Sequence, residues 1–104
     1  MLRIFIHYFL HFGLPWFIAK KIDSNQQIKI YIILIFTNLV DLDHLLADPV
    51  FDPNRCSIGF HTLHSTTAIL FYFILLFIPN FYIRLVSTGL ILHMLIDTLD
   101  CLWI

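Results

Sequence analysis

Residues 38–65 read NLVDLDHLLADPVFDPNRCSIGFHTLHS and join two long apolar stretches through a group of Asp and His residues. The sequence leaves the first apolar stretch through DLDH, residues 41–44, and enters the next through His61 and His64. On insertion scales, an Asp at the centre of a membrane-spanning helix costs about 2.5–3.5 kcal/mol. Ionisable side chains at the margins of such apolar stretches therefore indicate a functional site.

The composition is that of a membrane protein. Of the 104 residues, 60% are hydrophobic and 12% are charged, and the mean hydropathy is +0.87. Soluble domains are about 45–50% apolar. All the acidic residues are Asp, so the chain lacks the Glu that coats solvated helix faces. A net charge of −1 offers no basic surface for nucleic acid. We expect one integral membrane domain over residues 1–104, in contact with membrane lipid.

Four apolar stretches can be recognised, at about residues 2–19, 28–47, 60–78 and 81–103. Each is near the length of about 20 residues that a helix needs to cross the hydrocarbon core. Backbone polar groups in lipid must be paired within the segment, which favours helices. The predicted fold is an all-α, four-helix transmembrane bundle. Such a bundle is thin, so a homodimer is also plausible.

Basic residues in the connections predict the orientation. The first and third connections carry four of them, and the opposite side carries two. The four are Lys20, Lys21, Lys29 and Arg84, and the two are Arg3 and Arg55. By the positive-inside rule, both termini and the loop of residues 48–59 face away from the cytoplasm, in a bacterial inner membrane. The first apolar stretch lacks a small-residue cleavage site, so we expect it to be retained.

Ionisable residues recur at spacings of three or four, which place them on one face of a helix. These groups are His7 with His11, Asp41 with His44, His61 with His64, and His93 with Asp97 and Asp100. They lie early in the odd-numbered helices and late in the even-numbered ones, so an up-and-down bundle brings them to the same depth. We expect one shared polar site, with Asp100 the most solvated of its members.

A metal ion would offset the cost of this polar site. Four buried Asp residues would cost on the order of 12 kcal/mol, whereas structural zinc binding contributes about 10–16 kcal/mol. His and Asp ligands suit zinc, and also manganese or iron. The candidate ligands are Asp41, His44, His61, His64, His93, Asp97, His7 and His11. Hydrogen-bonded His and Asp pairs without metal are the alternative.

A metal with an open coordination position lowers the pKa of bound water to about 7 and so supplies hydroxide at neutral pH. An Asp that is not a ligand can then accept the proton, and we assign this catalytic role to Asp43. In a regular helix Asp43 would point away from Asp41.

The motifs VDLDHLL (residues 40–46), GFHTLHS (59–65) and LHMLIDTLD (92–100) resemble a family of small bacterial four-helix membrane proteins of unknown function. Their order is also similar to that in inner-membrane metal-dependent hydrolases, which carry Pro-Asp-x-Asp, then His-Arg-Gly-x-Thr-His-Ser, then a later His and Asp. The resemblance implicates Asp41, Asp43, His61, His64, His93 and Asp97. Ser65 matches the serine of the motif and is the second catalytic candidate beside Asp43.

Two positions depart from the hydrolase pattern. Val40 replaces the Pro, and Phe60-His61-Thr62-Leu63 replaces the His-Arg-Gly segment. The Arg that could recognise an anionic substrate is therefore missing, and Arg55 is a candidate substitute.

Three functions remain open from the sequence. The first is a metal-dependent hydrolase acting on a phosphoester or other ester carried by a lipid. The second is a module that binds or transports metal ions or protons, since intramembrane His and Asp residues serve both tasks. The third is a structural protein whose polar residues lock the bundle.

The loop of residues 48–59 and the two cysteines support weaker predictions. Asp48 and Asp52 precede Pro and are expected to form turns. Cys56 and Cys101 permit one disulfide but do not require it, and the predicted topology places both on one side of the membrane.

Overall fold

The first helical segment bends at Gly13. In the computed structural model, which describes residues 2–49 and 55–102, α1 spans Leu2–Phe12 and α2 spans Leu14–Ile22. The Gly13 N–H donates to the Phe9 carbonyl at 2.6 Å, and a Cβ at Gly13 would meet that carbonyl at 2.8 Å. The run is thus divided into two helices at Gly13, two residues before Pro15.

The second segment changes helix type halfway along. After the short 3₁₀ turn η1 (Ser24–Gln26), α3 spans Gln27–Phe36 and continues as the 3₁₀ helix η2, Thr37–Leu46. A 3₁₀ helix has about three residues per turn, so residues three apart lie directly above one another. Asp41 and His44 consequently share one edge of η2, while Asp43 is buried.

The third segment is shorter than the apolar stretch at residues 60–78. The 3₁₀ turn η3 spans Thr62–His64 and α4 spans Thr66–Leu75. Ser65 has extended backbone angles, and its hydroxyl accepts the Ala68 N–H at 3.2 Å, so Ser65 is the N-cap of α4. The helix cannot begin near Phe60, because the chain is extended at both His61 and Ser65.

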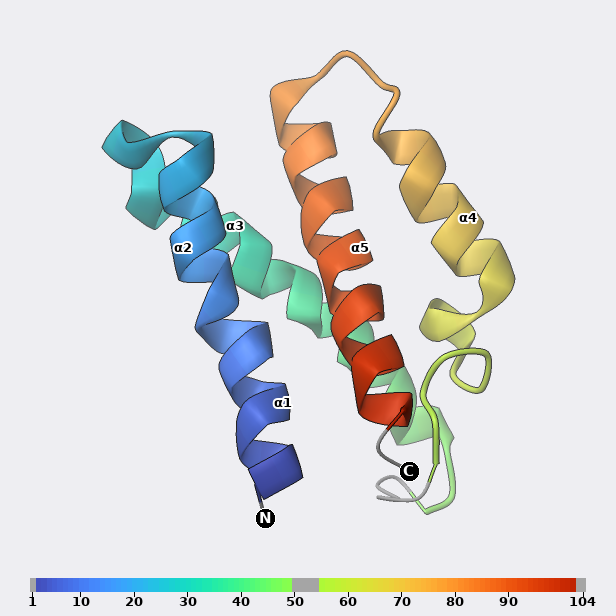
Figure 1. Cartoon of the computed structure of the whole chain (residues 1–104). Coiled ribbons are helices and arrows are strands. Elements are labelled where there is room, and N and C mark those ends of the chain that lie inside the picture. The colour runs from blue at the N-terminus through green and yellow to red at the C-terminus, as the bar shows by residue number, and fades with distance from the viewer. Residues whose placement is uncertain (1, 50–54, 103–104) are drawn as a thin grey trace.

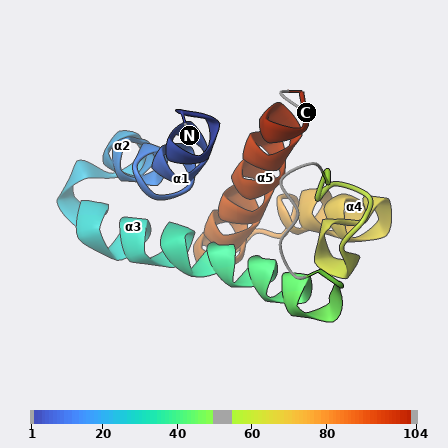
Figure 2. The same cartoon turned by 90° about the horizontal axis from the view of Figure 1, so that it is seen from below.

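The fourth segment, α5, is the central helix of the bundle. It spans Phe81–Cys101, and the Asn80 side chain caps it by accepting the N–H groups of Tyr82 and Ile83. The structure is all-α, with four helical segments in a compact bundle: α5 lies between the α1 and α2 pair and α4, while α3 and η2 cross behind it (Figure 1). The view from below shows α3 running across the bundle (Figure 2).

Two apolar clusters hold these segments together. Ala19, Ile30, Leu34 and Leu85 join α2, α3 and α5. Val40, Tyr72 and Met94 join η2, α4 and α5. Between the clusters α5 and η2 approach closely at Gly89, where a Cβ would lie 2.6 Å from Thr37 Oγ1 and 2.7 Å from its Cγ2.

The loop between η2 and η3 is tied to the end of α5. Cys56 and Cys101 form a disulfide with a Cα–Cα distance of 5.1 Å. The start of α1, the end of α5 and the described residues of this loop, 47–49 and 55–61, lie at the same end of the bundle, as the up-and-down topology requires (Figure 1). Asp52, which we expected in a turn, lies outside the described residues.

Among the described residues, two helical runs are long and apolar enough to cross a membrane: Leu2–Ile22 and Phe81–Cys101, of 21 residues each. α4 has 10 residues and so spans about 15 Å at 1.5 Å per residue.

The Gly89 crossing predicts a stability change. We expect Gly89→Ala to lower the free energy of unfolding by about 1–3 kcal/mol, because the new methyl group overlaps the buried Thr37 side chain. Denaturant titration in detergent measures this. Adding Thr37→Ala removes the two closest atoms and should restore part of the loss. A Gly89→Ala protein as stable as the wild type would contradict the close crossing.

Candidate metal centre

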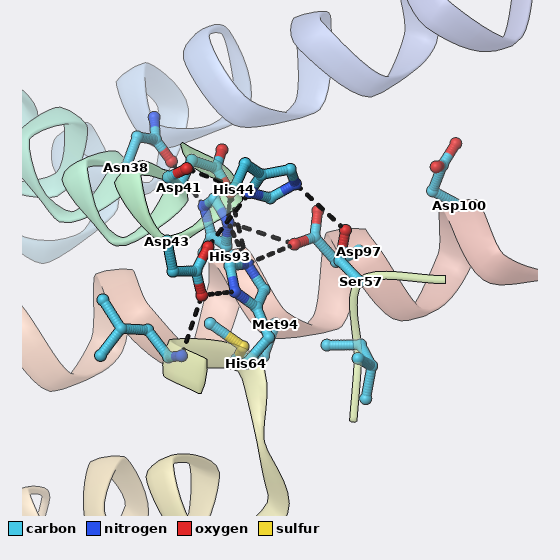
Figure 3. A network of polar contacts seen from close by, with 12 residues as sticks. Asn38, Asp41, Asp43, His44, Ser57, His64, His93, Met94, Asp97 and Asp100 are labelled. Atoms are coloured by element: carbon cyan, nitrogen blue, oxygen red, sulfur yellow. Dashed lines mark hydrogen bonds and ion pairs between the residues drawn. The ribbon is translucent and has the colours of Figure 1, made fainter. Parts of the chain in front are cut away.

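Four donor atoms from three helical segments converge at one end of the bundle. They belong to Asp41 on η2, His64 at the end of η3, and His93 and Asp97 on α5. Figure 3 shows these side chains pointing toward one another. One ligand atom from each lies within 4.8 Å of the other three. These four residues are called the cluster below.

The spacing of the four atoms suits tetrahedral coordination. His64 Nε2 lies 2.9 Å from Asp97 Oδ2, 3.2 Å from His93 Nε2 and 3.3 Å from Asp41 Oδ1. His93 Nε2 lies 3.2 Å from Asp97 Oδ2 and 3.0 Å from Asp41 Oδ1. A regular tetrahedron with edges of this length has its centre about 2 Å from each corner, which is the length of zinc bonds to His nitrogen and carboxylate oxygen. The sixth edge, between the two carboxylate oxygens, is at most 4.8 Å long.

The other nitrogen of His93 is held by Asn38. His93 Nδ1 donates to Asn38 Oδ1 at 2.8 Å, and the Asn38 amide nitrogen donates to the His11 carbonyl at 3.3 Å. The second contact fixes which end of the amide faces His93. An amide oxygen can only accept, so the proton of a neutral His93 resides on Nδ1 and its Nε2 presents a lone pair to the cluster.

Asp43 holds His64 in the same way. His64 Nδ1 lies 2.8 Å from Asp43 Oδ2, which also accepts the Leu63 N–H at 2.8 Å. Asp43 Oδ1 lies 3.1 Å from His44 Nδ1, and only 1% of the Asp43 side chain is exposed. These contacts place Asp43 behind His64, in the position of the carboxylate that orients a metal-binding His.

Exposure of the four side chains is uneven. The Asp41 side chain is 44% exposed, against 0% for His64, 1% for His93 and 5% for Asp97. Solvent or a ligand therefore reaches the four-atom group from the Asp41 side.

Two further groups of potential ligands adjoin the first. His7, His11 and Asp97 form one, and Asp43, His44 and His61 form the other. In the latter the rings of His44 and His61 stack with centroids 3.8 Å apart. The structure thus brings together every Asp and His that we proposed as a ligand, distributed over three adjoining groups.

Ser65 and Asp100 have other partners. The Ser65 hydroxyl caps α4, so its proposed catalytic role stays a prediction. Asp100 is not merely solvated, because Arg3 Nε and Nη2 bind its two carboxylate oxygens at 2.9 and 3.1 Å. Asn38 is not among the predicted site residues, although it lies three residues before Asp41 and so matches the spacing of the other groups.

Comparison with known proteins adds the family. Residues 1–104 match the family of unknown function DUF6122. The chain belongs to this family. Comparisons with curated proteins and with solved structures found no significant match. The resemblance to a family of unknown function therefore holds over the whole chain, and what this member of DUF6122 does must be argued from the cluster.

Asn38 provides a test of the cluster. We expect Asn38→Ala to weaken binding of Zn²⁺ about 10–100-fold, because His93 loses the acceptor that orients it. Competition with a chromophoric chelator in detergent measures the affinity. Asn25→Ala, in η1 at the opposite end of the bundle, is the control and should leave the affinity unchanged. Equal affinities for both variants would contradict the assignment.

Proposed function

We propose that this protein is a membrane-embedded, metal-dependent hydrolase whose ion is held by Asp41, His64, His93 and Asp97. One observation carries the proposal. The Nε2 atoms of two histidines face two carboxylates at 2.9–3.3 Å while their Nδ1 atoms are held by Asn38 and Asp43. In metal-binding histidines, the ring nitrogen that does not bind the metal is typically held by a hydrogen bond that fixes the orientation of the ring.

Charge balance favours a divalent ion. Two carboxylates and two neutral imidazoles neutralise one divalent cation, whereas without a metal His64 and His93 would have to be protonated to balance Asp41 and Asp97. Nitrogen and oxygen ligands in tetrahedral spacing fit zinc best, and manganese or iron also accept such ligands.

The bound ion would activate water for attack on an ester or phosphoester. The side chains around it would do the remaining work. Asp41 borders the open side, where a substrate can approach. His44 Nδ1 faces the Asp41 carbonyl oxygen at 3.0 Å and Asp43 Oδ1 at 3.1 Å, so the proton of a neutral His44 resides on Nδ1. Its Nε2, 3.4 Å from Ser57 Oγ on a side chain that is 25% exposed, is the nitrogen that can accept the proton released by the attacking water. Asp43 is better suited to hold His64 than to exchange protons, since it already has three partners.

Exposed apolar surface supports a membrane setting. Only 17% of the most apolar window of Leu2–Ile22 and 39% of that of Phe81–Cys101 are buried, so neither helix resembles the core helix of a soluble protein. Large apolar side chains such as Phe77 and Leu46 are 82% and 81% exposed. A cluster at one end of the bundle would lie near lipid head groups, which favours a lipid-borne substrate.

The disulfide supports the orientation that the basic residues predict. Disulfides persist in oxidising compartments such as the bacterial periplasm. The bond between Cys56 and Cys101 therefore agrees with a non-cytoplasmic location for the loop, the end of α5 and the cluster.

Reporter fusions test this orientation. We expect alkaline phosphatase fused after the last residue to be active, and the same enzyme inserted between α2 and α3 to be inactive, because it folds only outside the cytoplasm. A cytoplasmic fluorescent reporter at each position is the control and should give the opposite pattern. Active phosphatase at the α2 and α3 connection alone would reverse the proposed orientation.

The hydrolase proposal makes a joint prediction for metal and activity. Detergent-purified protein should contain a stoichiometric transition metal and hydrolyse a member of a panel of ester and phosphoester lipids. We expect Asp41→Ala and His64→Ala to lose both, because each removes a ligand. Elemental analysis and a product assay measure the two properties.

Asp23→Ala is the matched control, since Asp23 caps η1 at the other end of the bundle, and it should retain both properties. A metal-free wild type would exclude the proposal. Metal binding without turnover across the panel would leave a metal-binding protein and exclude the substrate classes tested.

A further inference from the structure

We propose that the site holds two metal ions, with Asp97 as the bridging carboxylate and with His7 and His11 of α1 as ligands to the second ion. This inference rests on the proposed function, because the first ion is the one already assigned to Asp41, His64, His93 and Asp97.

The two oxygens of Asp97 face different sets of histidines. Oδ2 lies 2.9 Å from His64 Nε2 and 3.2 Å from His93 Nε2. Oδ1 lies 3.1 Å from His11 Nε2 and 3.6 Å from His7 Nε2. One carboxylate thus offers one oxygen to each group, and His7, His11 and Asp97 can each place a ligand atom within 4.8 Å of the others.

Hydrogen bonds among the described residues do not satisfy the two α1 histidines. His11 is 3% exposed, yet His11 Nδ1 and His7 Nδ1 are both buried without a hydrogen-bond partner there. The rings lie with centroids 4.3 Å apart. In either neutral tautomer, two imidazoles converging on one carboxylate oxygen leave a nitrogen of each ring unpaired. A cation bound by the two Nε2 atoms beside Asp97 Oδ1 would leave the proton of each ring on Nδ1, and His7 Nδ1 faces Asp100 Oδ1 at 3.9 Å.

The charges around the cluster also favour a second ion. Asp41, Asp43 and Asp97 carry three negative charges at the site, whereas Asp100 is neutralised by Arg3. One divalent ion leaves this region with a net negative charge, which would repel hydroxide and a phosphoester. A second divalent ion makes the net charge positive by one, so that the centre attracts either anion.

The packing of α1 on α5 positions His7 and His11, the proposed ligands of the second ion. Arg3, His7 and His11 follow one another at intervals of four and form one stripe on α1. The stripe faces His93, Asp97 and Asp100 on α5: Arg3 binds Asp100 one turn beyond Asp97, and the rings of His11 and His93 lie 4.3 Å apart. The ion pair of Arg3 holds the two helices in register, so that both α1 histidines meet Asp97.

The remaining group, Asp43, His44 and His61, is a weaker candidate for a metal. Asp43 would be its carboxylate, but this side chain already binds the Leu63 N–H, His64 and His44. Among the described residues, Asp97 Oδ1 faces the two α1 histidines. Two-metal hydrolases hold their ions about 3.5–4 Å apart, and a carboxylate that offers one oxygen to each ion is suited to such a pair.

Metal stoichiometry tests the inference. Protein purified in detergent and saturated with Zn²⁺ should contain two ions per chain, and the double variant His7→Ala/His11→Ala should contain one. Phe5→Ala, an exposed large-to-small change on the same helix, should retain two. A wild type with one ion, or a double variant with two, would overturn the bridged pair while sparing the proposed function. A wild type without metal would overturn both.

A second measurement uses the wild-type protein alone, so its outcome does not depend on whether the variants fold. Protein loaded with Mn²⁺ should give the spin-coupled EPR spectrum of two neighbouring ions once two equivalents are bound. Progressive filling that yields only the spectrum of isolated Mn²⁺ would show that no bridged pair forms.

Discussion

The convergence of His64 and His93 on Asp97 is the interaction on which the site depends. It joins η3 to α5, and both imidazoles are almost fully buried. Desolvated His and Asp groups are costly unless each polar atom has a partner. The surrounding contacts of Asn38 and Asp43 meet that need on one side of each ring, and a metal ion would meet it on the other.

The fold places these groups by irregular backbone as much as by helices. η2 is wound as a 3₁₀ helix over the residues that carry Asp41, Asp43 and His44. The extended backbone at His61 and Ser65 delays the start of α4 and leaves η3 free to turn His64 inward. A regular α-helix through either segment would have presented a different set of side chains. The disulfide then ties the connecting loop to the end of α5, beside the cluster.

The arrangement also explains why the first helix belongs to the bundle. Arg3, His7 and His11 all contact α5 through ionisable groups. The rest of α1 exposes large aromatic side chains such as Phe5 and Phe9. In an apolar environment, polar contacts of this kind give a helix a preferred face and register, because its apolar side chains pack equally well against lipid.

Hydropathy and residue spacing were sufficient to predict the helical class, the number of segments and the gathering of His and Asp at one end. Hydrophobic length and the spacing of three or four residues depend only on local geometry. The tertiary structure decided which of these residues meet. It separated Asp41, His64, His93 and Asp97 from Asp43, His44 and His61, paired Asp100 with Arg3, and brought Asn38 behind His93. Such partners lie up to 97 residues apart in the chain, and local spacing carries no information about which helix faces which.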